Sequence, residues 1–343
     1  MPAIQVIKRR FPGHRFVLLT DEHAGRSNYV SSWDVLGPTG WFDEVIFYTP
    51  GKAVWDMSKK GFSLIRKVRK LSPEYIFNLS PVRSCWQTAR DRFYFKHLIG
   101  HVRYNAPRRR VFFYRDEQSC KGADGCEPEW EILLGLAGGH GSGAGFKLIV
   151  PGNESARFQR IARAKGFCFL PEDKKQKLLA VGPGSKMPAK RWPAQNFCEL
   201  GKLLLKKFPQ LHLMVLGGRE DEETGNELCR AWGERSCNFA GELSIYGSAA
   251  ALERCAGFVG NDSGTMHLAA MTGAPCVALF SARDRPGKWA PYGDNHIILR
   301  HNTECAGCML EECAAQHGQC LRLITPPRVF EAVRKILAGS TDA

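Results

Sequence analysis

Short apolar runs alternate with amphipathic stretches along the whole chain. In the first half the apolar runs lie at residues 16–19, 45–48 and 75–79. Runs of this length, bounded by polar or turn residues, predict buried strands. Residues 4–10 and 58–70 carry apolar side chains at helical spacing, so we expect helices there. Strands that alternate with helices are typical of a parallel sheet covered by helices.

The same alternation is more regular after residue 177. We expect strands at residues 178–181, 211–216, 258–260 and 275–280. The helices predicted around them cover residues 155–165, residues 196–208 with Asn196 as N-cap, and residues 221–232, and two more start at Ser244 and at Thr265. This pattern predicts the α/β fold class.

The length of 343 residues predicts more than one domain, because it exceeds what a single hydrophobic core usually holds. The polar run at residues 171–177 indicates a linker. We therefore predict an N-terminal domain over residues 1–170, a second domain over residues 171–325, and a C-terminal helix and tail over residues 326–343. Residues 116–145 carry no pattern that predicts their structure.

Composition and charge narrow the class of partner. Hydrophobic residues make up 44% and charged residues 24%, as in globular proteins, and the formal net charge of +14 predicts attraction to polyanions. No apolar run reaches the roughly 20 residues of a membrane helix, and no signal-peptide pattern follows Met1, which predicts a cytoplasmic protein. Nucleic acid is disfavoured as a partner, because the basic runs lack interleaved aromatic residues and no nucleic-acid motif is present.

One loop carries the strongest sign of ligand chemistry. Residues 260–267, Gly-Asn-Asp-Ser-Gly-Thr-Met-His, join a predicted strand to a predicted helix. In a parallel sheet such a junction lies at the carboxyl edge, where ligands bind. Small residues there let backbone N–H groups and the helix dipole receive a phosphate. The plainer alternative is that Asp262 or Ser263 caps the helix and Gly264 turns the chain.

Two further loops favour a nucleotide pocket. Residues 182–185 and 217–220 also follow predicted strands, so three small or polar loops should converge on one edge of the sheet. Lys190 offers a cation to a leaving phosphate, with Trp192 beneath it; a surface lysine and an interface tryptophan are the alternatives. Glu220 can accept hydrogen bonds from two ribose hydroxyls, because a carboxylate is an acceptor only.

Together these motifs resemble glycosyltransferase family 9, the bacterial ADP-heptose:lipopolysaccharide heptosyltransferases. The resemblance covers almost all of residues 178–330, through the loops above, Lys-Arg-Trp-Pro at 190–193, Ala-Gly-Glu-Leu-Ser at 240–244 and the cysteines near the end. It implies the GT-B architecture, two doubly wound Rossmann-like domains facing a cleft. It also implies transfer with inversion of the anomeric centre, without a divalent metal.

The resemblance further implies how the donor binds. Ser185 and Lys190 would contact phosphate, Lys190 balancing the charge of the leaving group. Glu220 would hold the ribose, and Leu243 would lie near the adenine.

The same resemblance gives roles to the loop at residues 260–267. Asp262 would face the sugar. Ser263, Gly264 and Thr265 would form the anion site at the start of the helix, and His267 would support the loop.

The beginning of the chain departs from the family. Members start with a strand and a Gly-Asp loop, whose Asp is the proposed general base, before a helix that resembles the one starting at Met1. We favour a truncated start, because a doubly wound sheet without its first strand would leave an apolar slot and unpaired backbone groups. The alternative is a protein that has lost the base. The catalytic base is therefore unknown, and Asp21 or Glu22 as a substitute is disfavoured.

Four cysteines, Cys305, Cys308, Cys313 and Cys320, have spacing close to that of zinc ligands, with His317 as an alternative ligand. Reduced thiols in a short loop, or disulfides formed on purification, are the alternatives. A bound zinc would be structural, because four protein ligands leave no open coordination position. Catalysis itself would need no cofactor.

The main functional hypothesis is therefore an inverting, metal-independent glycosyltransferase that moves a heptose from ADP-heptose to the lipopolysaccharide inner core. The partners would be that nucleotide sugar or a related one, the lipopolysaccharide acceptor and an anionic membrane surface. The protein would be cytoplasmic and peripheral at the inner face of the inner membrane. Two alternatives stay open: the same fold acting on another nucleotide sugar or acceptor, and a catalytically inactive nucleotide-binding homologue.

Overall fold

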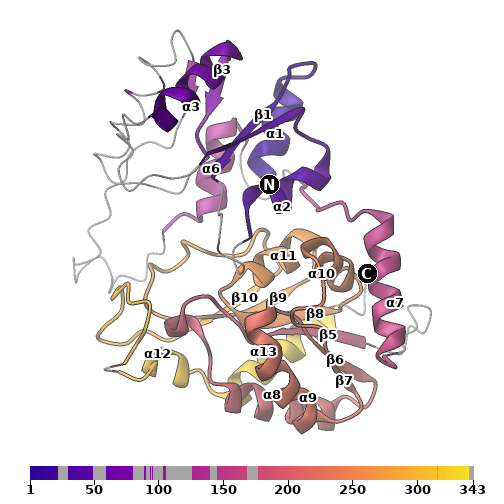
Figure 1. Ribbon diagram of the computed structural model, residues 1–343. Coiled ribbons are helices and arrows are strands. Elements are labelled where there is room, and N and C mark those ends of the chain that lie inside the picture. The colour runs from indigo at the N-terminus through magenta and orange to yellow at the C-terminus, as the bar shows by residue number, and fades with distance from the viewer. Residues whose placement is uncertain are drawn as a thin grey trace. The chain divides into compact units, whose positions relative to one another are not determined.

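The computed structural model describes residues 1–21, 30–48, 59–79, 89, 93, 95, 103–105, 126–139, 145–167, 177–314 and 316–339 (Figure 1). These residues divide into two compact units. The first contains residues up to 105 and residues 127–139, and the second contains residue 126 and residues 145–339. Glu22, residues 171–176 of the predicted linker and most of residues 116–145 lie outside the described residues.

Six parallel strands form the sheet of the second unit. They are β5 (Lys177–Gly182), β6 (Leu211–Val215), β7 (Ser236–Asn238), β8 (Gly257–Asn261), β9 (Cys276–Phe280) and β10 (Ile297–Arg300). Their order is β7-β6-β5-β8-β9-β10. The chain thus runs from β5 to one edge, returns to lie beside β5, and then runs to the other edge. This is the doubly wound order, with its topological switch point between β5 and β8.

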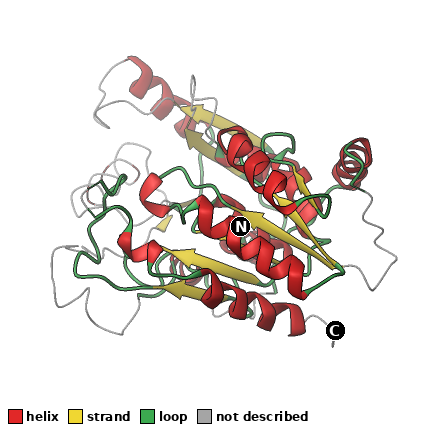
Figure 2. Cartoon of the chain, turned by 90° about the horizontal axis from the view of Figure 1, so that it is seen from below, coloured by secondary structure: helices red, strands yellow, loops and turns green. Residues whose placement is uncertain are grey.

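Helices cover both faces of this sheet, as Figures 1 and 2 show. On one face lie α8 (Ala194–Lys207), α9 (Glu222–Trp232) and α13 (Pro326–Gly339), and on the other lie α10 (Ile245–Leu252) and α11 (Gly264–Thr272). The central strands are apolar and buried along their length, which is typical of a parallel sheet covered on both sides. Leu179 and Val181 of β5 point into the core beneath α8 and α13.

The helix α7 (Gly152–Ala164) corrects the predicted domain boundary. It packs on α10 and therefore belongs with the second unit, whereas the sequence placed the boundary at residue 170. Phe158 of α7 also contacts Phe239, the residue after β7, with ring centroids 5.6 Å apart. The apolar face of α7 thus contributes to the core of the second unit.

The first unit contains two separate pairs of parallel strands among its described residues. β1 (Val17–Asp21) pairs with β2 (Glu44–Tyr48), and β3 (Tyr75–Phe77) pairs with β4 (Arg103–Asn105). The helices are α1 (Pro2–Arg10), α2 (Ser32–Leu36), α3 (Lys59–Lys70) and α6 (Glu129–Ala137), with a short 3-10 helix at Gly37–Thr39. Helix α1 packs on α6 through Ala3, Ile7 and Ala137.

The predicted strands and helices are confirmed, with shifts at their ends. Asn196 lies inside α8, whose N-cap is Pro193, so its predicted capping role is wrong. Ser244 does cap α10, because its hydroxyl accepts a hydrogen bond from the backbone N–H of Gly247 at 2.9 Å. The sequence analysis missed β4, β7 and β10, which have three or four residues each. No helix of the described residues is long and apolar enough to cross a membrane.

The switch point demands glycine where β5 and β8 approach each other. A Cβ atom at Gly260 would lie 2.5 Å from the carbonyl oxygen of Gly182 and 2.7 Å from the ring of Phe258. We therefore expect Gly260→Ala to destabilise the second unit by about 1–3 kcal/mol, the usual effect of overpacking. Thermal and urea unfolding would measure it.

The matched control is Gly152→Ala, because no atom lies within 4 Å of a Cβ atom at that helical position. Alanine there should leave the free energy of unfolding unchanged or raise it by a few tenths of a kcal/mol. Equal losses in both variants would show that the close approach at Gly260 is not the cause.

Candidate functional site

The loops after β5 and β8 meet at the carboxyl edge of the sheet, at the switch point. The hydroxyl of Ser185 donates a hydrogen bond to the carbonyl oxygen of Asp262 at 3.3 Å. This bond joins the loop that follows β5 to the loop that begins α11. Because ligands of doubly wound folds bind in the crevice at this point, the predicted site lies where such a fold places one.

Asn261, the last residue of β8, holds these loops together. It is fully buried; its side-chain amide donates to the carbonyl oxygen of Pro183 at 2.6 Å, and its side-chain oxygen accepts from the backbone N–H of Trp192 at 3.0 Å. Trp192 is itself buried, and its indole N–H donates to the carbonyl oxygen of Ile324. Trp192 is thus a buried core residue rather than an exposed interface residue.

Four buried charged side chains form an ion cluster beside Asn261. The Lys190 ammonium lies 2.6 Å from an oxygen of Asp262 and 3.2 Å from an oxygen of Asp284, and the Arg283 guanidinium lies 2.7 Å from that same Asp284 oxygen. Each of the four residues is at most 8% exposed. The two positive and two negative formal charges cancel. Pairing of this kind offsets part of the cost of removing charged groups from water. The sequence analysis found Lys190 and Asp262 but missed Arg283 and Asp284.

The electrostatic environment shifts the pKa of Asp284 in the cluster and that of the neighbouring His267. Burial alone would raise the pKa of Asp284, but Lys190 and Arg283 outweigh it and lower that pKa, so this carboxyl is ionised at neutral pH. Burial lowers the pKa of His267, while the nearby Asp262 carboxylate opposes this and Lys190 adds to it. His267 is therefore a neutral imidazole next to the cluster.

The start of α11 offers hydrogen-bond donors. Ser263 is the N-cap, but its side chain makes no capping bond, so the capping alternative is wrong for this residue. Its hydroxyl is buried and has no hydrogen-bond partner among the described residues. A Cβ atom on the exposed Gly264 would meet no atom within 4 Å, so the first turn, which continues with Thr265, is open. An orphan hydroxyl and free helix N–H groups suit an anion.

Glu220, the residue predicted to hold the ribose, lies in the loop that follows β6, next to a second carboxylate, Asp221. Glu220 is exposed in the 3-10 helix Arg219–Asp221, whereas Asp221 is half-buried and accepts from the backbone N–H of Gly218 at 3.0 Å. A Cβ atom at Gly184 would overlap the Asp221 carboxylate, so this carboxylate lies over the end of β5. Burial raises the pKa of Asp221, and Gly218 partly opposes the rise.

Leu243 lies farther along the same edge of the sheet. It is half-buried and directly precedes the N-cap of α10. The loop that carries it contacts the loop after β6, because the backbone N–H of Gly241 donates to the carbonyl oxygen of Gly217 at 3.1 Å. Leu243 and Glu220 thus lie on the β6 and β7 side, and Ser185, Lys190, Asp262 and Ser263 lie at the switch point.

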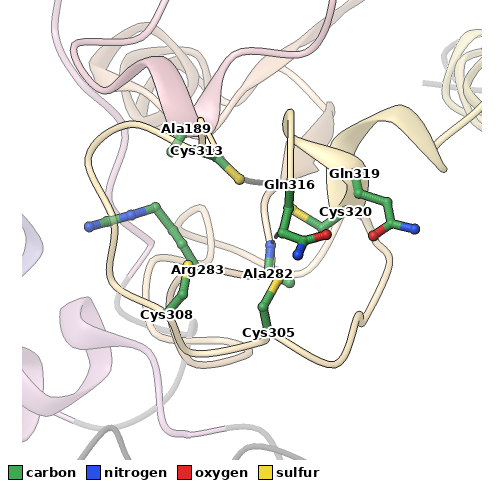
Figure 3. A pocket seen from close by; sticks show the side chains of 9 residues that line it. All are labelled: Ala189, Ala282, Arg283, Cys305, Cys308, Cys313, Gln316, Gln319 and Cys320. Atoms are coloured by element: carbon green, nitrogen blue, oxygen red, sulfur yellow. Dashed lines mark hydrogen bonds between the residues drawn. The ribbon is translucent and has the colours of Figure 1, made fainter.

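The cysteines Cys305, Cys308, Cys313 and Cys320 line one small pocket (Figure 3). Cys320 accepts a hydrogen bond from the backbone N–H of Ala282 at 3.4 Å. Burial raises the pKa of Cys320, and Cys305 and Cys313 act in the same direction. All four are free thiols, and no three His, Cys, Asp or Glu side chains of the described residues are arranged to hold a metal ion. Zinc binding therefore stays a prediction, and His317 does not line the pocket.

Comparison with known proteins shows what the segment that holds this site is similar to. Residues 151–318 match the family model described as glycosyltransferase family 9 (heptosyltransferase). Lipopolysaccharide heptosyltransferase 2 of Salmonella typhimurium is 32% identical over 166 residues, and the protein of that name from Escherichia coli is 32% identical over 165 residues. Residues 151–318 belong to glycosyltransferase family 9. The chain matches about half the length of these relatives, since the alignments cover 47% of this chain and 47% of each relative.

Solved structures extend the likeness in fold beyond the family 9 segment. The structure of E. coli ADP-heptose lps heptosyltransferase II superposes with a TM-score of 0.62 at 20% identity, covering 98% of this chain and 94% of that one. A glycosyltransferase family 9 protein from Veillonella parvula superposes with a TM-score of 0.68 at 19% identity, covering 98% and 92%. The predicted GT-B fold of the α/β class is confirmed.

Proposed function

We propose that this protein is an inverting glycosyltransferase that moves a heptose from ADP-heptose to the lipopolysaccharide inner core. The observation that carries the proposal is the buried pair of Lys190 and Asp262 at the switch point, next to the open start of α11. The names of the curated relatives support the reaction, and the name of the E. coli structure supports the donor.

The leaving ADP is stabilised by protein groups, with no divalent metal required. A lysine ammonium has three N–H donors. Two of those of Lys190 point to Asp262 and Asp284, which leaves the third for a phosphate oxygen. The Ser263 hydroxyl and the helix N–H groups of Gly264 and Thr265 add further donors. Fixed donors of this kind act on the charge that develops on the leaving group.

Asp262 faces the sugar, and Ser185 holds its loop. The neutral His267 lies beside Asp262 without adding a charge, which fits the supporting role assigned to it. The base that deprotonates the acceptor is unknown. Asp21 ends β1 in the first unit and Glu22 lies outside the described residues, so neither is assigned the role.

The first unit carries charge that suits an anionic acceptor. Helix α3 exposes Arg66, Lys67, Arg69 and Lys70, while Val68 is buried. With the net charge of +14, this face would attract a lipopolysaccharide acceptor or an anionic lipid surface, and a cytoplasmic protein peripheral at the inner membrane follows from the proposal. Nucleic acid is not a proposed partner.

Nucleotide selectivity tests the proposed donor. We expect ADP to bind more tightly than UDP, GDP or CDP in an isothermal titration, because the pocket would read adenine. Lys190→Ala should weaken ADP binding about tenfold or more, since it removes the cation that meets the diphosphate. Lys202→Ala, an exposed lysine on α8, is the matched control and should change nothing.

Asp262→Ala separates binding from transfer in the same series. It should reduce heptose transfer far more than ADP binding, because its carboxylate faces the sugar. Equal binding of all four nucleotides would remove the ADP-heptose assignment. ADP binding without transfer would support the inactive homologue, and transfer from another nucleotide sugar would support the other alternative.

A further test decides which of two neighbouring carboxylates contacts the ribose. Resemblance assigns this contact to Glu220, and the geometry favours Asp221, because the Asp221 carboxylate lies against Gly184 in the loop after β5, whereas Glu220 is exposed. We expect Asp221→Asn to weaken ADP about tenfold and to abolish the preference for ADP over 2′-deoxy-ADP, because a carboxylate accepts from ribose hydroxyls better than an amide does. Glu220→Gln should have less than about a twofold effect, and the reverse pattern would restore the assignment to Glu220.

We also propose that the four cysteines, which line one pocket but are not arranged to hold a metal ion in this structure, rearrange to hold a structural zinc. The expected result is about one zinc per chain in protein purified without chelators, measured by atomic emission, since four thiolates complete a tetrahedral site. Cys308→Ser should lower the zinc content, and Cys198→Ser, a cysteine of α8, should not. Metal-free protein with four titratable thiols in this loop would contradict the proposal.

A further inference from the structure

Asp284, like Arg283, is a member of the ion cluster for which neither the sequence nor the proposed function provides a role. It lies four residues after the end of β9 and is 5% exposed. Its side-chain oxygen lies 3.2 Å from the Lys190 ammonium and 2.7 Å from the Arg283 guanidinium. A buried carboxylate shared by two cations is costly to assemble, so its position calls for an explanation.

Asp284 is held in place from two sides. Its carboxylate accepts from Arg283, whose other N–H groups donate to the carbonyl oxygens of Leu310 at 2.6 Å and Met309 at 2.7 Å. Its backbone carbonyl accepts from Arg300 of β10 at 3.0 Å. Because side chain and backbone are both tied to other segments, the carboxylate is a rigid anchor.

Lys190 is flexible by comparison, and it is tied to the same segment. Its ammonium stands at the end of a four-carbon stem with several rotatable bonds. Its 3-10 helix, Pro188–Lys190, is attached through the backbone N–H of Ala189, which donates to the carbonyl oxygen of Glu311 at 2.9 Å. Residues 309–311 thus hold both the backbone beside Lys190 and, through Arg283, the carboxylate that Lys190 meets.

We propose that Asp284 is a positioning residue that aims the Lys190 ammonium at the diphosphate of the donor. Asp262 is the other carboxylate at this ammonium, and under the proposed function, on which this inference rests, it also serves the sugar. Asp284 keeps Lys190 in place while Asp262 engages the sugar, so that a Lys190 N–H stays directed at phosphate. Asp284 would thus favour donor binding by orienting the Lys190 ammonium and not by adding charge to the site.

Two substitutions separate position from charge. Asp284→Asn removes a negative charge, so charge alone would make ADP bind more tightly. Asp284→Glu keeps the charge and displaces the carboxylate by one methylene group. We expect both variants to weaken ADP binding about fivefold or more, because both release Lys190 from its anchored position. Asp294→Asn, an exposed aspartate in the same loop region, is the matched control and should bind ADP as the wild type does.

A double-mutant cycle tests whether Asp284 acts through Lys190. In a Lys190→Ala background, Asp284→Asn should change ADP affinity by less than about twofold, because the group that it positions is gone. A merely structural role would give additive losses. Thermal unfolding of each variant separates misfolding from loss of positioning. If Asp284→Asn does not fold, Arg283→Lys should still weaken ADP, because lysine cannot span both carbonyl oxygens and the carboxylate.

The outcomes distinguish this inference from the proposed function. If the wild type does not bind ADP, the proposed function fails and the inference fails with it. If the wild type binds ADP and Lys190→Ala weakens it, the site stands. Unchanged or tighter binding by Asp284→Asn, unchanged binding by Asp284→Glu, or additivity in the cycle would then overturn the role of Asp284 alone.

Discussion

The pairing of β5 with β8 is the constraint on which the rest of the site depends. Gly182 and Gly260 let the two strands approach at their carboxyl ends, and Asn261 then joins the loops that leave them. A buried asparagine with both side-chain groups engaged is costly to disturb, because any shift of one loop would leave a donor or an acceptor unsatisfied. The positions of Lys190 and the start of α11 follow from that junction, since each lies within a few residues of it.

The electrostatics of the site follow from how its charges are buried. An isolated buried lysine would lose its proton or move to solvent, and an isolated buried aspartate would be protonated. Lys190 meets Asp262 and Asp284, and Asp284 meets Arg283, so the formal charges of the four side chains cancel. Under the proposed function, a cluster balanced in this way does not repel an arriving diphosphate. The attraction then comes from the directed N–H groups of Lys190 and of the helix start, which a rigid frame keeps in position.

The second half of the fold was predictable because its signals are local. Buried strands of three to six residues, helices of regular period and small residues at the strand ends all appear in the sequence, and β5, β6, β8 and β9 confirm the strands. The contacts of Asp284 were not predictable, because Arg283 and Asp284 form only a charged dipeptide until folding brings Lys190, 94 residues earlier in the chain, to their side. The sequence could not show whether Glu220 or Asp221 is better placed for the ribose, for a similar reason. Two adjacent acidic side chains point in different directions, and the folded backbone sets those directions.

Backbone hydrogen bonds join the loop that carries the cysteines to the segment that carries Arg283. The loop that carries Cys305, Cys308 and Cys313 donates from Gly307 to the carbonyl oxygen of Ala282 and from Met309 to that of Arg283. Met309 adopts φ +57°, an unfavourable conformation for a side chain of its kind, which the surrounding hydrogen bonds must hold. Any change at the thiols that loosened this loop would therefore release Arg283, and through it the carboxylate that anchors Lys190. Arg283, a member of the ion cluster, also lines the pocket of the cysteines.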